Sequence, residues 1–218
     1  MQLNTIIFDM DGLLIDSEPL WGEAATEVFS DYGFKLTPAQ YAITTGMRTK
    51  EFVEWWFKHF KINEQHHAAA VQNILTTVVD KVIAKGKPMA GVEHIFNFFI
   101  ERNFKIGLAT SSGQKLIDVV VDKLGIRNYL QAIESAADLP YGKPHPQVYL
   151  NCAAALNSHP TECVCFEDSF NGIIAAKAAR MRCVAVPGIH DRQNIKFNAA
   201  DLKISSLQNF NALLLQTL

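Results

Sequence analysis

The sequence lacks long apolar segments, an excess of basic residues and a leader-like start, and each absence argues against a class of protein. No apolar run approaches the ~18 residues expected of a membrane span, so we expect no membrane-spanning segment. The 20 lysines and arginines are balanced by 22 aspartates and glutamates, and the net charge of −2 gives no electrostatic basis for nucleic-acid binding. The first residues show neither the basic start nor the apolar core and cleavage site of a signal peptide, so we expect a cytoplasmic protein.

Paired cysteine motifs are also missing. The four cysteines, Cys152, Cys163, Cys165 and Cys183, do not form the Cys-x-x-Cys spacing of zinc sites or redox motifs. Cys163 and Cys165 alternate along an apolar, strand-like run, which favours thiols packed in a core.

What remains is the composition of a soluble globular protein. Hydrophobic residues make up 49% of the chain and charged residues 19%, unlike the low hydrophobicity of disordered chains. A length of 218 residues suits one large domain, or one domain carrying a smaller insert.

Strand and helix patterns alternate along much of the chain. Short β-branched and aromatic runs predict strands at residues 5–8, 105–109, 132–134, 163–166 and 183–186. Apolar residues at helical spacing predict helices at residues 92–102, 114–124, 147–156 and 172–179. Such alternation indicates a parallel sheet with helices on both faces.

Residues 17–85 interrupt this alternation, because they show helical spacing throughout and no strong strand candidate. Asp16 or Ser17 is expected to cap the first of these helices. We therefore predict an α/β protein with a Rossmann-like parallel-sheet core, formed by residues 1–16 and 86–218. Residues 17–85 are predicted to be an inserted all-helical domain.

Two carboxylates, Asp9 and Asp11, follow the first predicted strand. If that strand persists through Asp11, its period of two points both side chains to the same side, where they could hold a cation. The competing interpretation is an exit turn, since Asp and Gly are ordinary turn formers. In open α/β sheets, however, ligands bind beyond the carboxyl ends of the strands, which is where both residues fall.

Other polar residues follow the remaining strands. Thr110 and Ser111 precede a helix, where hydroxyl and N–H groups can receive a phosphate oxygen or simply cap the helix. Lys143 lies in a proline-rich turn and either neutralises anions or is a solvated surface lysine. Glu167 and Asp168 can complete an oxygen-ligand site for Mg²⁺ or cap the next helix. The four motifs in this order are hard to explain as turns and caps alone.

In these residues the chain resembles the haloacid dehalogenase-like hydrolase superfamily. Residues 9–12, Thr110, Lys143 and the pair 167–168 are similar to its four motifs, and residues 17–85 resemble its helical cap. Within the superfamily the chain resembles the β-phosphoglucomutase-like branch, and residues 9–21 and 139–150 look like bacterial phosphatases of hexitol and 2-deoxyglucose phosphates.

The resemblance implies a catalytic role for each acidic residue. Asp9 would be the nucleophile that forms an aspartyl-phosphate, and Asp11 the general acid and base. Mg²⁺ would be held by Asp9, by the backbone carbonyl of Asp11 and by Asp168. Glu167 would lie just outside the metal ligands and support a water on the metal.

For the phosphoryl group, the resemblance implies binding by Thr110, by the backbone of Ser111 and by Lys143. The substrate would be a small phosphorylated metabolite such as a hexitol phosphate or 2-deoxyglucose 6-phosphate. We expect a monomer that binds neither nucleic acid nor membranes.

Three other functions compete with hydrolysis. Dehalogenation would need neither Asp11 nor the magnesium acids. A phosphosugar mutase shares all four motifs, but the mutase branch has a histidine where Trp21 falls and a lysine where Gly113 falls. A non-catalytic, receiver-like module would lack both the acid two residues after the nucleophile and the helical insert.

Substrate selection is expected to rest with the inserted helices, which would close over the site. Arg48 is a candidate contact to sugar hydroxyls or phosphate, the alternative being an exposed arginine at a helix start. Trp21, Trp55 and Trp56 could stack on a sugar, although their spacing is also typical of a helical core. Hinges are expected near residues 14–17 and 85–89.

Overall fold

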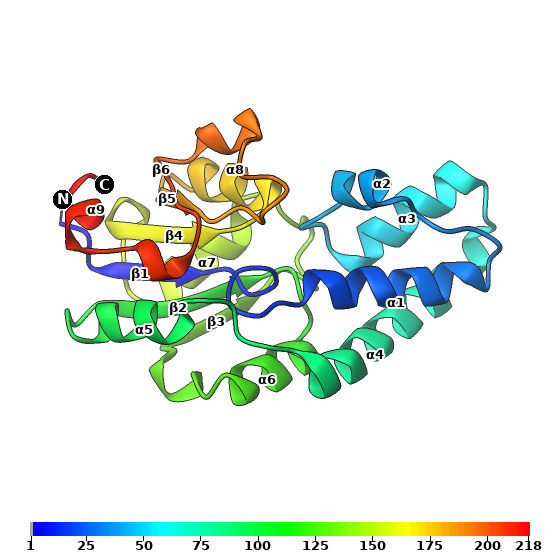
Figure 1. Cartoon of the computed structure of the whole chain (residues 1–218), viewed down its shortest axis with the longest axis horizontal. Coiled ribbons are helices and arrows are strands. Elements are labelled where there is room, and N and C mark those ends of the chain that lie inside the picture. The colour runs from blue at the N-terminus through cyan, green and yellow to red at the C-terminus, as the bar shows by residue number, and fades with distance from the viewer. Residues whose placement is uncertain (1) are drawn as a thin grey trace.

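The computed structural model describes residues 2–218 and contains a six-stranded parallel sheet in the order β3-β2-β1-β4-β5-β6 (Figure 1). The strands are β1 (Thr5–Phe8), β2 (Lys105–Thr110), β3 (Ala132–Ser135), β4 (Cys163–Glu167), β5 (Arg182–Ala185) and β6 (Leu202–Lys203). The central strand, β1, pairs with β2 and β4, so that Phe8 lies between Leu108 and Phe166. The predicted Rossmann-like α/β core is confirmed.

Helices cover both faces of this sheet. They are α5 (Val92–Ile100), α6 (Gln114–Lys123), α7 (Gln147–Ala155), α8 (Phe170–Ala178) and the C-terminal α9 (Ala212–Gln216). Within residues 2–218, five short 3-10 helices lie among the longer elements, at Glu64–His66, Arg127–Tyr129, Pro160–Glu162, Ile195–Ala199 and Leu207–Asn209.

The alternation of side chains along β1 divides the core into two layers. Ile6 and Phe8 pack into the layer that contains α5 and α6, whereas Ile7 packs into the layer that contains α7 and α8. The four cysteines are free and buried, as expected for core thiols. The predicted strands and helices of the core match within about two residues at each end, and the short edge strand β6 was not predicted.

Between β1 and α5 the chain forms four α-helices, α1 (Glu18–Ser30), α2 (Pro38–Ile43), α3 (Thr49–Phe60) and α4 (His67–Lys85). Figure 1 shows them packed together beyond one end of the sheet, with α4 beside α1. An aromatic cluster lies inside them, in which the ring of Phe29 stacks on that of Phe52 at 5.4 Å. No helix among residues 2–218 has both the length and the apolarity needed to span a bilayer.

The two connections to these helices run side by side. The backbone N–H of Asp16 donates to the carbonyl of Lys87, and that of Met89 donates to the carbonyl of Leu14, at 2.9 Å each. An isolated bridge also joins Ile15 to Pro88. The chain therefore leaves and re-enters the core through one paired segment.

Candidate active site

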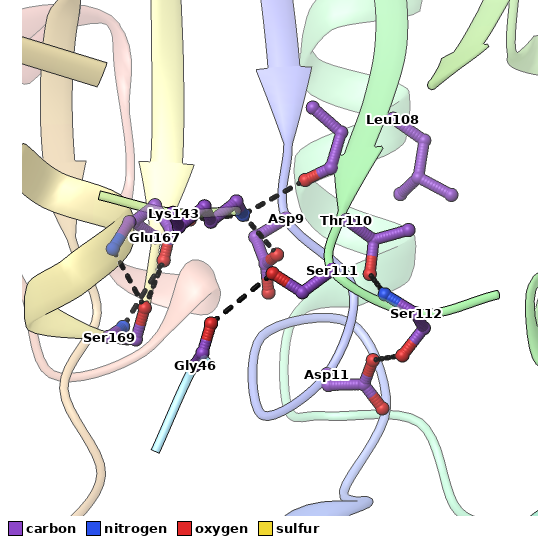
Figure 2. Close-up of polar contacts among 12 residues, drawn as sticks. Asp9, Asp11, Gly46, Leu108, Thr110, Ser111, Ser112, Lys143, Glu167 and Ser169 are labelled. Carbon is purple, nitrogen blue, oxygen red and sulfur yellow. Dashed lines mark hydrogen bonds and ion pairs between the residues drawn. The ribbon is translucent and has the colours of Figure 1, made fainter. Parts of the chain in front are cut away.

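A buried lysine links two of the predicted motifs. Lys143, which is only 3% exposed, donates from Nζ to Asp9 Oδ1 and to Glu167 Oε1 at 2.6 Å each, and to the carbonyl of Ala109 at 3.1 Å (Figure 2). Burial lowers the pKa of Lys143, but the negative charges of Asp9 and Glu167 outweigh that effect and raise the pKa above its ordinary value. The lysine is therefore a fixed cation beside Asp9.

Glu167, the last residue of β4, is fully buried and has both carboxylate oxygens occupied. Oε1 accepts hydrogen bonds from Lys143 and from the hydroxyl of Tyr149. Oε2 accepts from the backbone N–H of Ser169 at 3.2 Å and from its hydroxyl at 3.0 Å. These contacts leave Glu167 in position to hold Lys143.

The acidic residues form a group that could hold a cation. Asp9, Glu167 and Asp168 each offer a carboxylate oxygen, and these atoms all lie within 4.8 Å of one another. Burial raises the pKa of Asp9 well above its ordinary value, against the lowering effect of Lys143. Burial and the neighbouring carboxylates raise the pKa of Asp168 in the same way. With all three carboxylates ionised, the single positive charge of Lys143 does not balance their negative charge. An all-oxygen group of this kind therefore fits Mg²⁺, a hard cation.

Gly12 allows Asp168 to approach the loop that contains Asp9 and Asp11. Gly12 has φ of +76°, a conformation that favours glycine, and a Cβ atom there would lie 2.1 Å from Asp168 Oδ2. Only a residue without a side chain permits this contact.

Asp11 has a separate set of partners. Its Oδ1 accepts from the Ser17 hydroxyl at 2.7 Å and from Trp21 Nε1 at 2.9 Å. Its Oδ2 accepts from the Ser112 hydroxyl at 2.6 Å, as Figure 2 shows. The prediction that Asp9 and Asp11 point to the same side required the strand to continue through Asp11. Because β1 ends at Phe8, that condition is not met. The Asp11 side chain is held away from Lys143 by its own donors.

The prediction that Ser17 or Asp16 caps α1 is right about the position of Ser17 and wrong about its hydrogen bond. Ser17 occupies the N-cap position but makes no capping hydrogen bond, because its hydroxyl donates to Asp11 instead. The helix begins at Glu18 with Pro19 in its first turn, where a missing N–H costs nothing.

Thr110 and Ser111 lie at the end of β2, next to Asp9. The Thr110 hydroxyl accepts from the backbone N–H of Ser112 at 3.1 Å, so it shapes this turn rather than capping α6. The Ser111 hydroxyl donates to the carbonyl of Gly46 in the inserted helices, at 3.2 Å. Figure 2 shows both residues on the side of Asp9 that faces Asp11.

A cavity lies between the end of the sheet and the inserted helices. From the sheet side it is lined by Asp9, Asp11, Thr110, Ser111, Ser112, Lys143, Asp168 and Ser169. From the inserted helices and the segments joining them it is lined by Glu18, Trp21, Ala25, Tyr41, residues 44–47, Thr49, Phe52 and Ile74. Most of the residues predicted for the site therefore face one cavity.

Arg48 is the exception among the predicted substrate contacts, because it does not line the cavity. Its guanidinium donates to backbone carbonyls in the segment after β3 and pairs with Glu51. Of the three tryptophans, only Trp21 faces the cavity; Trp56 is buried and donates to Thr44, and Trp55 is 51% exposed.

Glu18 lines the cavity and was not predicted, because it follows Ser17 in what looks like an ordinary helix start. Burial and the charges of Asp11 and Asp16 raise the pKa of Glu18 from 4.5 to about 7. Between these two values the folded protein keeps a proton that the unfolded chain has lost. The free energy of unfolding contributed by Glu18 therefore falls as the pH rises from 4.5 to about 7.

We expect Glu18→Gln to weaken this pH dependence. Without added metal, the melting temperature of the wild type should fall more steeply between pH 5 and about 7.5 than that of the variant, by a few degrees. Melting curves at several pH values provide the measurement, with the exposed Glu54→Gln as the control. Parallel curves for the wild type and Glu18→Gln would contradict the assignment.

Comparison with known proteins decides the family. The family model of haloacid dehalogenase-like hydrolases matches residues 6–186. The chain belongs to this family. It is 38% identical to hexitol phosphatase B of Escherichia coli over 97% of this chain and 96% of that protein. It is 30% identical to the fructose-1-phosphate phosphatase YqaB of E. coli, over 83% of this chain and 95% of that protein.

Solved structures of this family show the same fold. The crystal structure of β-phosphoglucomutase from Clostridium difficile superimposes with a TM-score of 0.85, at 23% identity, over 99% of this chain and 96% of that one. Together with the named relatives, family membership makes the chain a phosphatase.

Proposed function

We propose that this phosphatase hydrolyses phosphate monoesters of small sugars or sugar alcohols, with Mg²⁺ and through an aspartyl-phosphate on Asp9. The observation that supports this most directly is the position of Asp9. It faces the cavity from the end of β1, lies 2.6 Å from the fixed cation of Lys143 and belongs to an acidic group suited to Mg²⁺. The hexitol and fructose 1-phosphate activities named for the relatives indicate the class of substrate.

In the first step a carboxylate oxygen of Asp9 attacks phosphorus, and the bond from phosphorus to the sugar oxygen breaks. Asp11 gives its proton to the leaving alkoxide. In the second step water attacks the phosphoryl group, Asp11 takes the proton from that water, and Asp9 is released as a carboxylate. Ser17, Trp21 and Ser112 hold the Asp11 carboxyl group in one orientation through both steps.

The phosphoryl oxygens are proposed to bind at Lys143, Thr110 and the backbone N–H of Ser111. All three residues line the cavity next to Asp9, and donors fixed before the reaction stabilise charge that develops in the transition state. Mg²⁺, held by Asp9, Asp168 and the Asp11 backbone, would neutralise phosphoryl charge and orient the phosphate. Glu167 supports this arrangement by holding Lys143.

We further propose that residues 17–85 act as a cap domain over a core of residues 1–16 and 86–218, in a monomer. The cavity takes its lining from both parts, and the paired connections at residues 14–17 and 86–89 provide a hinge. A closed cap would exclude bulk water and place the sugar against side chains such as Trp21 and Glu18.

A mutase needs a site that grips a second phosphate, and the expected place for it offers no side chain. Gly113 has open space where a Cβ atom would be, so a lysine would fit there but is not present. The side chain of Trp21 has one polar hydrogen, on Nε1, and donates it to Asp11 rather than to a second phosphate. These observations favour hydrolysis.

The test is a phosphate-release screen over hexose, deoxyhexose, hexitol and pentose phosphates, with Mg²⁺ and with EDTA. We expect steady release from at least one hexose or hexitol phosphate, and loss of at least about 100-fold in EDTA. Phosphate that moves between positions of a sugar without release would show a mutase. Labelling of the protein without turnover would show a receiver-like module, and full release in EDTA would contradict the role of Mg²⁺.

A further inference from the structure

Arg48 joins the inserted helices to the core through several hydrogen bonds. It lies at the start of α3, and its side chain is only 11% exposed. Nη1 donates to the carbonyl of Ala136 at 3.2 Å and to that of Leu139, and Nη2 donates to that of Pro140 at 3.4 Å. Nη2 also pairs with Glu51, which keeps the guanidinium in place. All three carbonyls belong to the segment between β3 and α7.

The same segment leads directly to Lys143. At Gly142, the residue before it, a Cβ atom would lie 2.7 Å from Arg48 Nε and 2.9 Å from Glu51 Oε2. Arg48 therefore packs on the backbone next to the residue that bridges Asp9 and Glu167. Within residues 2–218, Arg48 Nε is buried without a hydrogen-bond partner. Arg48 therefore packs on this backbone even though one of its donors is left unpaired.

Two more hydrogen bonds connect the core to the residues just before Arg48. The Ser111 hydroxyl donates to the carbonyl of Gly46, and Asn171 Nδ2 donates to that of Thr45, at 3.2 Å each (Figure 2 shows the first). Residues 45–48 thus meet segments that follow β2, β3 and β4. Of these contacts, those of Arg48 reach the segment that presents Lys143.

We propose that Arg48 is a positioning residue. It fastens the inserted helices over the site and, through the same hydrogen bonds, sets the backbone of residues 136–142 so that Lys143 meets Asp9. A planar guanidinium can donate to several carbonyls at once, which a lysine ammonium on a flexible chain does not reproduce. The catalytic consequence rests on the proposed function, because it assumes that Lys143 acts in phosphoryl transfer.

A double-mutant cycle tests this coupling, using Arg48→Ala, Gly142→Ala and the double variant. The added methyl group of Gly142→Ala pushes against Arg48 and Glu51, neither of which lines the cavity. We expect each single variant to lower kcat/KM by about 10- to 100-fold, to a similar degree for every accepted substrate. The double variant should be no worse than the more severe single variant. Arg48→Lys should lose about as much kcat/KM as Arg48→Ala, because the lysine does not reproduce the hydrogen bonds of the guanidinium.

Hydrogen–deuterium exchange gives a readout that needs no substrate. Residues 44–49 and 136–143 should both exchange faster in Arg48→Ala and in Gly142→Ala, with little change elsewhere. The matched controls are Lys50→Ala, an exposed cation on the same helix, and Gly188→Ala, where a Cβ atom meets nothing within 4 Å. Both should behave as the wild type in kinetics and exchange.

Several results would overturn the proposal. Additive effects of the two substitutions would show that Arg48 and Gly142 act independently. A change confined to KM that varies with the hydroxyl pattern of the substrate would make Arg48 a direct substrate contact. Unchanged exchange at residues 136–143 would separate Arg48 from Lys143. If the wild type releases no phosphate, the proposed function fails, whereas the exchange data still decide whether Arg48 couples the two segments.

Discussion

Asp9→Asn is expected to lower Mg²⁺-dependent phosphate release by at least about 10⁴-fold, because the amide cannot form the aspartyl-phosphate. Removal of a nucleophile acts on kcat, and substrate can still bind to Lys143 and Thr110. The measurement is steady-state phosphate release on the best substrate of the screen, together with acid-quenched labelling of the protein, which should disappear in the variant.

The same substitution should leave the fold intact or make it more stable. Burial and neighbouring carboxylates disfavour the charged form of Asp9, and Lys143 keeps Glu167 as a partner when Asp9 is neutral. The melting temperature of Asp9→Asn should therefore equal or exceed that of the wild type. Asp80→Asn, an exposed carboxylate on α4, is the control. Turnover near the wild-type rate in Asp9→Asn would refute its role as nucleophile.

Lys143→Met is expected to damage both stability and activity. The lysine is the cation between two buried carboxylates, and breaking a buried ion pair from one side costs about 3–5 kcal/mol. For a chain of this length, each kcal/mol lowers the melting temperature by about 2–4 °C. Urea denaturation measures the loss, and phosphate release should fall below detection.

A second variant distinguishes the two effects of Lys143. Lys143→Met combined with Glu167→Gln removes one of the stranded charges, so it should recover part of the stability and none of the activity. Lys115→Met, at an exposed position of α6, is the control. A Lys143→Met protein with wild-type stability would mean that Asp9 and Glu167 are not charged around it.

The core and the strand-end motifs could be predicted because both follow from local patterns. Short, mostly apolar runs mark β1, β2 and β4. The rule that ligands bind beyond the carboxyl ends of parallel strands brings Asp9, Thr110 and Asp168 together. Neither inference requires knowledge of how distant side chains orient. The catalytic roles of these residues stay predictions.

The partners of Asp11 could not be predicted, since they come together only in the folded protein. Ser112 lies 101 positions from Asp11 in the sequence, and Ser17 looked like a helix cap. Trp21 lies at a position expected on an apolar helix face, and its spacing does not indicate that its indole N–H donates to Asp11. A polar side chain at helical spacing does not show whether it faces water or a buried carboxylate.

Arg48 is a residue for which a predicted contact is replaced by one that the sequence did not indicate. Its position in an insert above the sheet suggested a contact to substrate, but its two terminal nitrogens donate to backbone carbonyls about 90 residues away. Tyr149 is a further case, because an aromatic residue in α7 is expected in the core and gives no sign that its hydroxyl reaches Glu167. Backbone acceptors have no signature in a sequence.

The paired connections at residues 14–17 and 86–89 also limit how the inserted helices can move. Two adjacent segments joined by hydrogen bonds define one rotation axis, and motion in other directions would break the bonds from Asp16 to Lys87 and from Met89 to Leu14. We expect rotation about that axis to displace Trp21, which follows the first connection closely in the sequence, less than residues 45–48. The side chains of Ser111 and Asn171 bond to this second segment from the core. If the inserted helices open as proposed, we expect essentially one degree of freedom, with the contacts of residues 45–48 breaking before Asp11 loses its indole donor.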